Sequence, residues 1–244
     1  MPFTSEDLRV IYRDRHLVAI DKPSGLLVHR SEIARDVQVY ALQLVRKLVG
    51  RRVYAPHRLD RGTSGVLLFA IDRDLARPLA EAFASRAVDK TYHAIVRGHP
   101  PPDGVIERPI ETAEEPEPKD ARTAYRTVAT GVLDVPVGRY PEAWTALVEL
   151  RPHTGRRHQL RRHCAHLRHP IIGDTTYGDG KNNRAFREAL GLDRLMLYAT
   201  RLALDHPVTG ERLELRAPPD PLLTRVCARF GWPDPHAPAP EPPE

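Results

Sequence analysis

The sequence has little cysteine, no long apolar run and no leader-like start, and each shortage excludes a class of protein. Only Cys164 and Cys227 occur among 244 residues, and both lie among apolar residues at helical spacing. We therefore expect two buried, reduced thiols rather than a disulfide. No segment approaches the ~20 apolar residues that a membrane span requires. The N-terminus MPFTSEDLRV also lacks the apolar core of a signal peptide, so we expect a cytoplasmic protein with no membrane partner.

The sequence also lacks the glycine spacing of a nucleotide-binding loop. The segments GTSG and HTGRR fit neither the G-x-x-x-x-G-K-S/T pattern nor the G-x-G-x-x-G pattern, so a bound ATP or NAD is not supported. Ser64 follows Thr63 without a G-x-S-x-G context, which disfavours a serine hydrolase. We expect no cofactor.

Positive charge is present in modest excess and is unevenly distributed. Lys and Arg number 37 against 32 Asp and Glu, which gives a net charge of +5. Residues 151–169 contain six Arg and five His and no acid, whereas acidic residues concentrate in 111–120. A one-sided basic segment is what binding to a phosphate backbone favours. Hydrophobic residues make up 41% of the chain and charged residues 28%, which is the composition of a globular protein.

The pattern of apolar residues predicts an α+β fold with more strands than helices and no βαβ alternation. The sheet should be mixed and mainly antiparallel, flanked by helices, in one domain over residues 1–232 that no separate RNA-binding module precedes. A loop is predicted over 99–120 and a disordered, Pro-rich tail over 233–244. Strands are predicted within 10–25, 65–71, 90–98, 121–130, 143–152 and a hairpin at 193–218, and helices over 36–50, 74–88, 158–169 and 220–231.

One acid lies in an unusual place, in HRLDRGTSGVLLFA at residues 57–70, where Asp60 stands between Arg58 and Arg61 at the entrance of an apolar strand. An acid in such a place is most often structural, closing a turn while an arginine compensates its charge. The alternative is a carboxylate that nearby guanidinium groups keep ionised, which suits a nucleophile better than a proton donor. The residues of this segment alone leave both interpretations open.

Two other features invite a functional interpretation. Four histidines, His158, His163, His166 and His169, suggest a metal site, but no acid lies nearby to neutralise a dication among so many arginines. A basic helix that meets phosphates explains this segment better, so we predict no metal site. Tyr92 on its own is typical of a half-buried strand aromatic.

Read together, these segments resemble the pseudouridine synthases of the RluA type. The block HRLDRGTSG matches the H-R-L-D-x-x-T-S-G signature, and three further blocks follow the family's order. They are VAIDKPSGLLVH before it, and KTYHAIVRG and HTGRRHQLRRHCAHLRHPIIGDTTYG after it. Together the four blocks cover residues 10–217. Three shorter segments, VHRSEIARD, PVGRYP and KNNR, are similar to family members that act on tRNA.

The resemblance implies a reaction and a set of residues that carry it. The reaction breaks the bond from uracil N1 to the ribose, rotates the base and rejoins it through C5, without redox change or energy input. Asp60 matches the nucleophilic aspartate, whose attack at C1′ or at C6 the sequence leaves open. Arg161 matches the arginine that pairs with this aspartate, a geometry that favours a planar guanidinium over lysine. Tyr92 matches the tyrosine that stacks on the base and is a candidate general base.

The resemblance also implies RNA contacts, because a stacked uridine must be flipped out of the helix before an enzyme can reach it. Arg58 matches the arginine that fills the vacated stack, and the basic segment would contact phosphates. The predicted substrate-binding residues are His57, Arg58, Leu59, Arg156, Arg157, His158, Arg162 and Arg168. The implied substrate is tRNA, at uridine 65 in the T-stem region, and we expect a monomer. The alternatives are ribosomal RNA as substrate, a non-catalytic RNA-binding protein on the same scaffold and a metal-dependent hydrolase.

Overall fold

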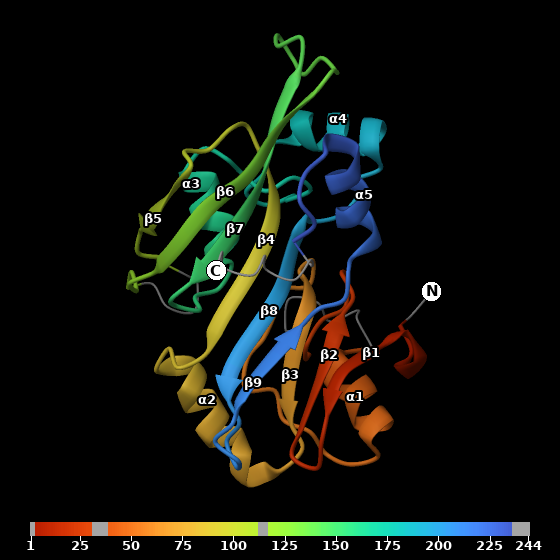
Figure 1. Cartoon of the computed structure of the whole chain (residues 1–244), viewed down its shortest axis with the longest axis vertical. Helices are drawn as coiled ribbons and strands as arrows, with labels where there is room; N and C mark the ends of the chain where they lie inside the picture. The colour runs from red at the N-terminus through yellow and green to blue at the C-terminus, as the bar shows by residue number, and fades with distance from the viewer. Residues whose placement is uncertain (1–2, 31–38, 112–116, 236–244) are drawn as a thin grey trace, which may run out of the picture.

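The computed structural model describes residues 3–30, 39–111 and 117–235. One sheet of nine strands runs through the described chain in the order β1-β2-β3-β8-β4-β7-β6-β5, with β9 paired to β8 (Figure 1). Only the β3–β8 pair is parallel, so the sheet is mixed and mainly antiparallel, as predicted. The strands are β1 (Arg9–Arg13), β2 (Leu17–Lys22), β3 (Ser64–Ala70), β4 (Asp89–Arg97), β5 (Asp103–Glu107), β6 (Arg122–Leu133), β7 (Ala143–Pro152), β8 (Leu197–Asp205) and β9 (Arg212–Arg216).

Helices flank this sheet. Figure 1 shows α3 behind β6 and β7, α1 near β1 and β2, α2 at the lower end of the sheet, and α4 and α5 at its upper end. In the described part of the chain no helix is long and apolar enough to cross a membrane. The helices are α1 (Ala41–Val49), α2 (Ala76–Ala84), α3 (Gln159–His166), α4 (Gly180–Leu190) and α5 (Pro221–Phe230), with short 3-10 turns η1 (Ser5–Asp7) and η2 (Arg73–Leu75).

Strand β3 is the rigid base of the segment that carries Asp60. All seven of its residues are buried, because β2 and β8 border it and apolar clusters cover both of its faces. At Gly65 the backbone has φ 107°, and an added Cβ would lie 2.2 Å from the carbonyl oxygen of Ala199. Only glycine tolerates both the conformation and the close approach. The GTSG segment therefore lets β3 pack closely against β8 directly after Asp60.

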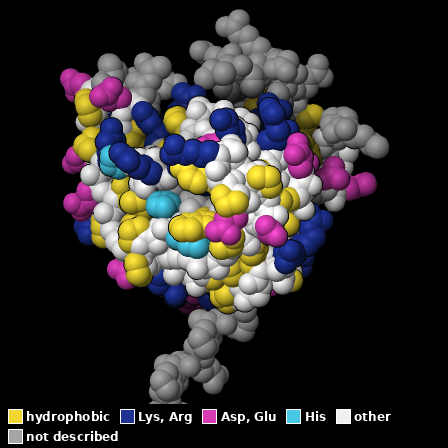
Figure 2. Space-filling view, turned by 90° about the horizontal axis from the view of Figure 1, so that it is seen from above, with side chains coloured by type: hydrophobic (Ala, Val, Ile, Leu, Met, Phe, Trp, Pro, Cys, Tyr) yellow, Lys and Arg dark blue, Asp and Glu magenta, His cyan; other side chains and the backbone are white. Residues whose placement is uncertain are grey.

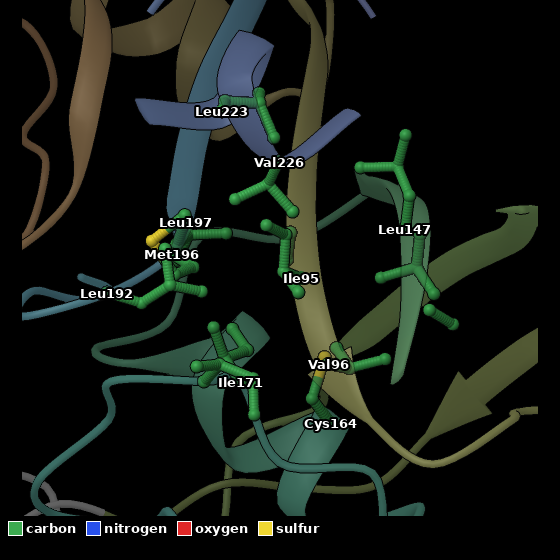
Figure 3. Close-up of a cluster of buried hydrophobic side chains, with 14 of the residues drawn as sticks. Ile95, Val96, Leu147, Cys164, Ile171, Leu192, Met196, Leu197, Leu223 and Val226 are labelled. Carbon is green, nitrogen blue, oxygen red and sulfur yellow. The ribbon is translucent and has the colours of Figure 1, made fainter. Parts of the chain in front are cut away.

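The largest apolar cluster lies between the sheet and the helices α3 and α5 (Figure 3). Ile95 and Leu147 from adjacent strands are completely buried, and Leu223 and Val226 of α5 pack into the same cluster. Each large aliphatic side chain buried in this way contributes about 1.5–3 kcal/mol to folding. Cys164 of α3 belongs to this cluster, and both cysteines are buried and free, as expected. The cluster fixes α3, and with it Arg161, against the sheet.

The structure differs from the sequence-based expectation in three places. The predicted loop over 99–120 is wrong in part, because β5 lies within it and pairs with β6. Helix α4 was not predicted, since among its side chains only Asn183 and Phe186 are buried and its apolar stripe is correspondingly thin. The predicted helix over 36–50 is described from Ala41 to Val49, while Asp36 and most of the tail at 233–244 lie outside the described residues.

Candidate active site

The loop that carries Asp60 is anchored from below by a buried lysine. Lys22, at the end of β2, has no exposed surface, and its Nζ donates to the carbonyl oxygens of Pro23 at 2.9 Å, Leu26 at 2.8 Å and Arg61 at 3.2 Å. The last of these bonds ties β2 to the residue that follows Asp60. The first sheet strands and the HRLD segment are therefore joined by one ammonium group.

Burial has a strong effect on that ammonium group. It lowers the pKa of Lys22 to about 7, against the opposing influence of the carboxylates of Asp60 and Asp21. A second pair of bonds holds the same loop, because the Ser24 hydroxyl donates to the carbonyl oxygen of Gly62 at 2.7 Å and the Gly25 amide donates to that of Arg61 at 2.8 Å. The position of Asp60 is thus set by contacts with the turn at residues 23–26.

Arg161 is the cation nearest to Asp60. Its Nη1 lies 3.7 Å from Oδ2 of Asp60, whose side chain is 22% exposed. No ion pair joins Asp60 to Arg58 or Arg61 in the described part of the chain, and the Arg61 side chain instead donates to the carbonyl oxygen of Gly25. The guanidinium that faces the carboxylate therefore comes from α3, about a hundred residues away, and not from its sequence neighbours.

Arg161 is itself held by a second carboxylate. Its Nε and Nη2 each donate to Asp174 at 2.8 Å, a bidentate pair, and the Asp174 side chain is only 1% exposed. Asp174 also accepts from the backbone amides of Thr176 and Tyr177. Although burial alone would raise the pKa of Asp174, these bonds lower it below its ordinary value. The guanidinium is thus locked in one orientation, with Nη1 left to face Asp60.

His158 is the other group close to Asp60. It precedes α3 in the left-handed conformation, with φ 56°, and its Nε2 lies 3.9 Å from Oδ1 of Asp60. Its Nδ1 lies 3.1 Å from the hydroxyl of Tyr177, a contact that can fix the tautomer. Burial lowers the pKa of His158 more than the nearby Asp60 raises it. At neutral pH the imidazole therefore adds little charge beside the carboxylate.

Tyr92 lies on β4, with its ring half-buried in the wall of the same cavity. Burial, and then the negative charge of Asp60, raise the pKa of its hydroxyl above the ordinary value of a tyrosine. The phenol therefore keeps its proton at neutral pH in the protein without RNA. A protonated phenol can stack on a nucleobase, but it cannot accept a proton as a general base.

These groups line a cavity of about 570 Å³, which we call the Asp60 cavity. Its volume lies in the usual range for small-molecule sites. Arg58 is exposed at its wall, and Arg86 and Lys90 also line it. Of the residues predicted from the sequence, the structure brings together around this cavity His57, Arg58, Leu59, Asp60, Tyr92, Arg156, His158 and Arg161.

Two residues of the HRLD block have strong structural contacts. His57 stacks on Phe83 at 4.3 Å between ring centroids, and its Nε2 accepts the Leu68 backbone amide at 3.0 Å. Burial lowers the pKa of His57 to about 3, so this ring is neutral. Leu59 is 6% exposed and belongs to the apolar cluster beneath the loop. Both residues fix the segment on either side of Arg58.

Three predicted RNA-binding arginines do not line the Asp60 cavity. Arg157 lies just before α3, Arg162 donates to the carbonyl oxygen of Glu111, and Arg168 lies beyond the end of α3. Arg156, which does line the cavity, also donates to the carbonyl oxygen of Asp120. A role for these side chains in phosphate binding stays a prediction.

Four of the five histidines of the basic segment have protein partners. His163 is completely buried, and its two ring nitrogens contact the Thr123 hydroxyl at 2.9 Å and the Arg108 carbonyl oxygen at 3.1 Å. His169 contacts the carbonyl oxygen of Arg97 at 2.8 Å. In the described ranges no group of three or more His, Cys, Asp or Glu side chains is arranged to hold a metal ion.

Sequence reasoning did not assign a role to Lys22 or Asp174, although both lie within blocks that it singled out. Lys22 is the lysine of VAIDKPSG, and Asp174 is the acid of HPIIGD. An isolated lysine after an apolar strand and an isolated acid after an arginine-rich helix were the available signals. Neither signal states which distant group the side chain will contact.

A second hollow of about 960 Å³ meets the Asp60 cavity at a shared rim. We call it the sheet-face groove; it is lined by residues of β4, β6, β7, β8 and β9. Four of its arginines are paired, with Glu149 contacting Arg126 and Arg151, and Glu214 contacting Arg201 and Arg216. On the face seen in Figure 2, basic side chains likewise lie in groups with acidic and apolar ones between them. The residues that line both hollows are Arg86, Lys90, Pro152 and His153.

Comparison with known proteins identifies relatives along most of the chain. Residues 16–166 match the family model described as RNA pseudouridylate synthase. A tRNA pseudouridine synthase C of Salmonella typhi is 47% identical over 235 residues, which cover 92% of this chain and 90% of that protein. The protein of the same name from Vibrio cholerae is 43% identical and covers 92% and 96% of the two chains. A third, from Pectobacterium carotovorum, is 47% identical, but the match spans only 62% of that relative.

Solved structures give the same result at lower identity. The chain superposes on human RNA pseudouridylate synthase domain containing 1 with a TM-score of 0.73 and 27% identity, covering 96% of this chain and 92% of that one. For human RNA pseudouridylate synthase domain containing 4 the TM-score is 0.70 and the identity 29%, covering 92% and 94%. The sequence relatives and the superposed structures therefore point to the same family and the same fold.

Proposed function

Because the chain belongs to the RNA pseudouridylate synthase family, we propose that it isomerises one specific uridine of tRNA to pseudouridine, with Asp60 as the nucleophile. The observation that carries this proposal is the pair formed by Asp60 and Arg161 at 3.7 Å in the wall of a cavity large enough for a nucleoside. The tRNA substrate is proposed from the names of the relatives, and uridine 65 in the T-stem region is proposed as its target from the family resemblance of the sequence alone.

The chemistry balances without any further reagent. The bond between N1 of the uracil and C1′ of the ribose breaks, and a bond between C5 and C1′ forms after the base rotates. The proton that leaves C5 is matched by one that N1 gains, so the product is an isomer of the substrate. Asp60 attacks as a carboxylate, which the guanidinium of Arg161 faces at 3.7 Å.

The neighbouring residues fit the steps that precede and follow this attack. Arg58 is exposed at the cavity wall, two residues before Asp60, where it can occupy the place that the flipped uridine leaves. The ring of Tyr92 is placed in the wall to stack on the base. The raised pKa of Tyr92 means that any proton it accepts from the substrate requires a change in its surroundings when RNA binds.

The test is to incubate the purified protein with unmodified transcripts of tRNA and of ribosomal RNA, and to map pseudouridine by carbodiimide treatment and primer extension. We expect product at one position of tRNA. Asp60→Asn should lower the rate by a factor on the order of 10³ or more, because the amide is not a nucleophile. RNA affinity, measured by gel shift, should change by less than about threefold.

A matched control is Asp134→Asn, since Asp134 is an exposed acid after β6 that does not line the Asp60 cavity. It should leave the rate unchanged. Product formed only on ribosomal RNA would replace tRNA as the substrate. Activity that survives Asp60→Asn would refute the nucleophile, and RNA binding without product on any transcript would favour a non-catalytic role.

A further inference from the structure

Helix α2 ends in a conformation that its sequence does not favour. Its last turn is followed by Ser85 and by Arg86, which has φ 69°, and the amide of Ala87 donates to the carbonyl oxygen of Ala82 at 3.0 Å. This pattern is the Schellman motif, in which the left-handed residue is usually glycine because a side chain is strained there. At the end of α2 the chain has an arginine instead.

Other helices of the same chain end with the favoured residue. Helices α1, α4 and α5 are followed by Gly50, Gly191 and Gly231, with φ of 79°, 68° and 66°. Glycine thus follows three of the five helices, whereas α3, like α2, is followed by a left-handed arginine, Arg168, with φ 66°. Strain kept at a position where glycine would relieve it suggests that the side chain has a use.

The place of Arg86 suggests what that use is. Arg86 lies on the rim where the Asp60 cavity and the sheet-face groove meet, and Lys90 and His153 line the same rim. The Arg86 side chain is exposed, and its guanidinium makes no hydrogen bond or ion pair with any residue that the structure describes. The Lys90 Nζ has only a long contact, 3.5 Å, to the carbonyl oxygen of Thr154.

The paired arginines of the sheet-face groove differ from the two cations of the rim in having acidic partners. Glu149 and Glu214 each neutralise two groove arginines at hydrogen-bonding or salt-bridge distance. None of the described acids pairs with Arg86 or Lys90 of the rim, so these two cations remain available to an anion at the mouth of the Asp60 cavity. A phosphate is the anion that a guanidinium fork and an ammonium bind together most readily.

We propose that Arg86 and Lys90 bind a backbone phosphate of the RNA strand beside the flipped uridine, and so hold the strand across the rim. The inference rests on the proposed function, because it assumes RNA in the Asp60 cavity. It assigns the contact to the α2–β4 connection, outside the basic segment at 151–169. The contact would be independent of base identity, since it is made to the backbone.

Arg86→Gly tests the proposal, because it removes the guanidinium and relieves the backbone together. We expect the Kd for a substrate RNA to rise about fivefold or more, and the slope of log Kd against log salt to decrease by about 1. The KM should rise similarly, while kcat at saturating RNA stays within about twofold. The melting temperature should stay the same or rise by a few degrees, because glycine is favoured at this position.

Three further variants separate the loss of the guanidinium from the relief of backbone strain. Arg73→Ala removes an exposed arginine from the 3-10 turn η2 before the same helix, outside both hollows, and should leave Kd and the salt slope unchanged. Arg168→Gly makes the same substitution after α3, where Arg168 has φ 66°, and measures the effect of relieved strain on stability. Arg86→Lys should restore part of the affinity lost in Arg86→Gly.

An Arg86→Gly protein with unchanged Kd and unchanged salt slope would overturn this inference and leave the proposed function intact. A wild-type protein that forms pseudouridine on no RNA would instead refute the proposed function. Because affinity is measured without turnover, the contribution of Arg86 can be decided in either case.

Discussion

Two carboxylates, those of Asp174 and Asp60, lie on either side of Arg161, and they differ in burial and in hydrogen bonding. Asp174 is almost fully buried and accepts four hydrogen bonds, two from Arg161 and two from backbone amides. Asp60 is 22% exposed, and within the described ranges its carboxylate accepts no hydrogen bond, with Arg161 at 3.7 Å and His158 at 3.9 Å.

The difference agrees with the roles proposed above, in which Asp174 is a positioning group and Asp60 is the reacting group. A carboxylate that accepts four hydrogen bonds holds a guanidinium in place and is a poor nucleophile. A carboxylate that faces a fixed positive charge without tight hydrogen bonds keeps its lone pairs available for attack. Arg161 lies between the two carboxylates, and its bonds to Asp174 fix the guanidinium that faces Asp60.

The largest expected effect that separates these two roles comes from Asp174→Asn. The change leaves the nearly buried guanidinium of Arg161 without its anionic partner, which should lower the free energy of unfolding by about 3 kcal/mol. Activity should fall by about 100-fold, because Nη1 is no longer held toward Asp60. Urea denaturation measures the first effect, and the tRNA assay measures the second.

Asp60→Asn is the matched control, since it is the same substitution on the opposite side of Arg161. It should abolish turnover and change the free energy of unfolding by less than about 1 kcal/mol. Because the folded pKa of Asp174 is lowered, its stabilisation is present above the ordinary carboxyl pKa and is lost as pH falls through the folded value. Equal loss of stability in the two variants would show that the two carboxylates do not differ in role.

The next effect concerns Lys22, which anchors the loop on the Asp60 side. Lys22→Met removes the donor of the Pro23 and Leu26 carbonyl oxygens and one of the two donors of the Arg61 carbonyl oxygen, and we expect a loss of about 2 kcal/mol at pH 7. Turnover should fall about tenfold as the support of Asp60 loosens. The free energy of unfolding and the tRNA assay are again the measurements.

The pH dependence of stability, compared between the wild type and Lys22→Met, tests whether the pKa of Lys22 is lowered in the folded protein. Burial lowers the pKa of Lys22 to about 7, so between about pH 7 and pH 10 the unfolded chain binds a proton that the folded protein does not. The stability of the wild type should therefore rise with pH in this window relative to Lys22→Met. A constant difference between the two proteins across the window would mean that Lys22 keeps an ordinary pKa in the fold.

The same comparison shows which parts of the site the sequence could reveal. The strand after Asp60 was predictable because seven consecutive residues are apolar or small and are buried on both faces. Asp60, Tyr92 and Arg161 were found as members of matching blocks, and they line one cavity. The two partners that set their geometry were not found, because the Arg161–Asp174 and Lys22–Arg61 contacts depend on tertiary structure, 13 and 39 residues apart.

The two missed elements have a related cause. Strand β5 lies in a segment rich in proline and acid, and only Ile106 of its five residues is buried. Helix α4 buries Asn183, which donates to the Asp174 carbonyl oxygen, and accepts the Gly173 amide. A polar side chain that is buried by its hydrogen bonds does not add to an apolar pattern. Elements that support the site through polar contacts are therefore the least visible in sequence.

The smallest expected effect lies at the boundary between the two sides, at Tyr177. Its ring lies 5.1 Å from the Arg161 guanidinium, and its hydroxyl lies 3.1 Å from Nδ1 of His158. Tyr177→Phe keeps the ring over the guanidinium and removes only the hydroxyl contact, so it should cost about 1 kcal/mol or less. Turnover should fall no more than about threefold, because His158 approaches Asp60 only to 3.9 Å. Tyr177→Ala, which removes the ring as well, should cost more in both assays. If Tyr177→Phe instead reduced turnover as strongly as Asp174→Asn, the orientation of His158 would matter as much as that of Arg161, and Asp60 would depend on two positioned partners.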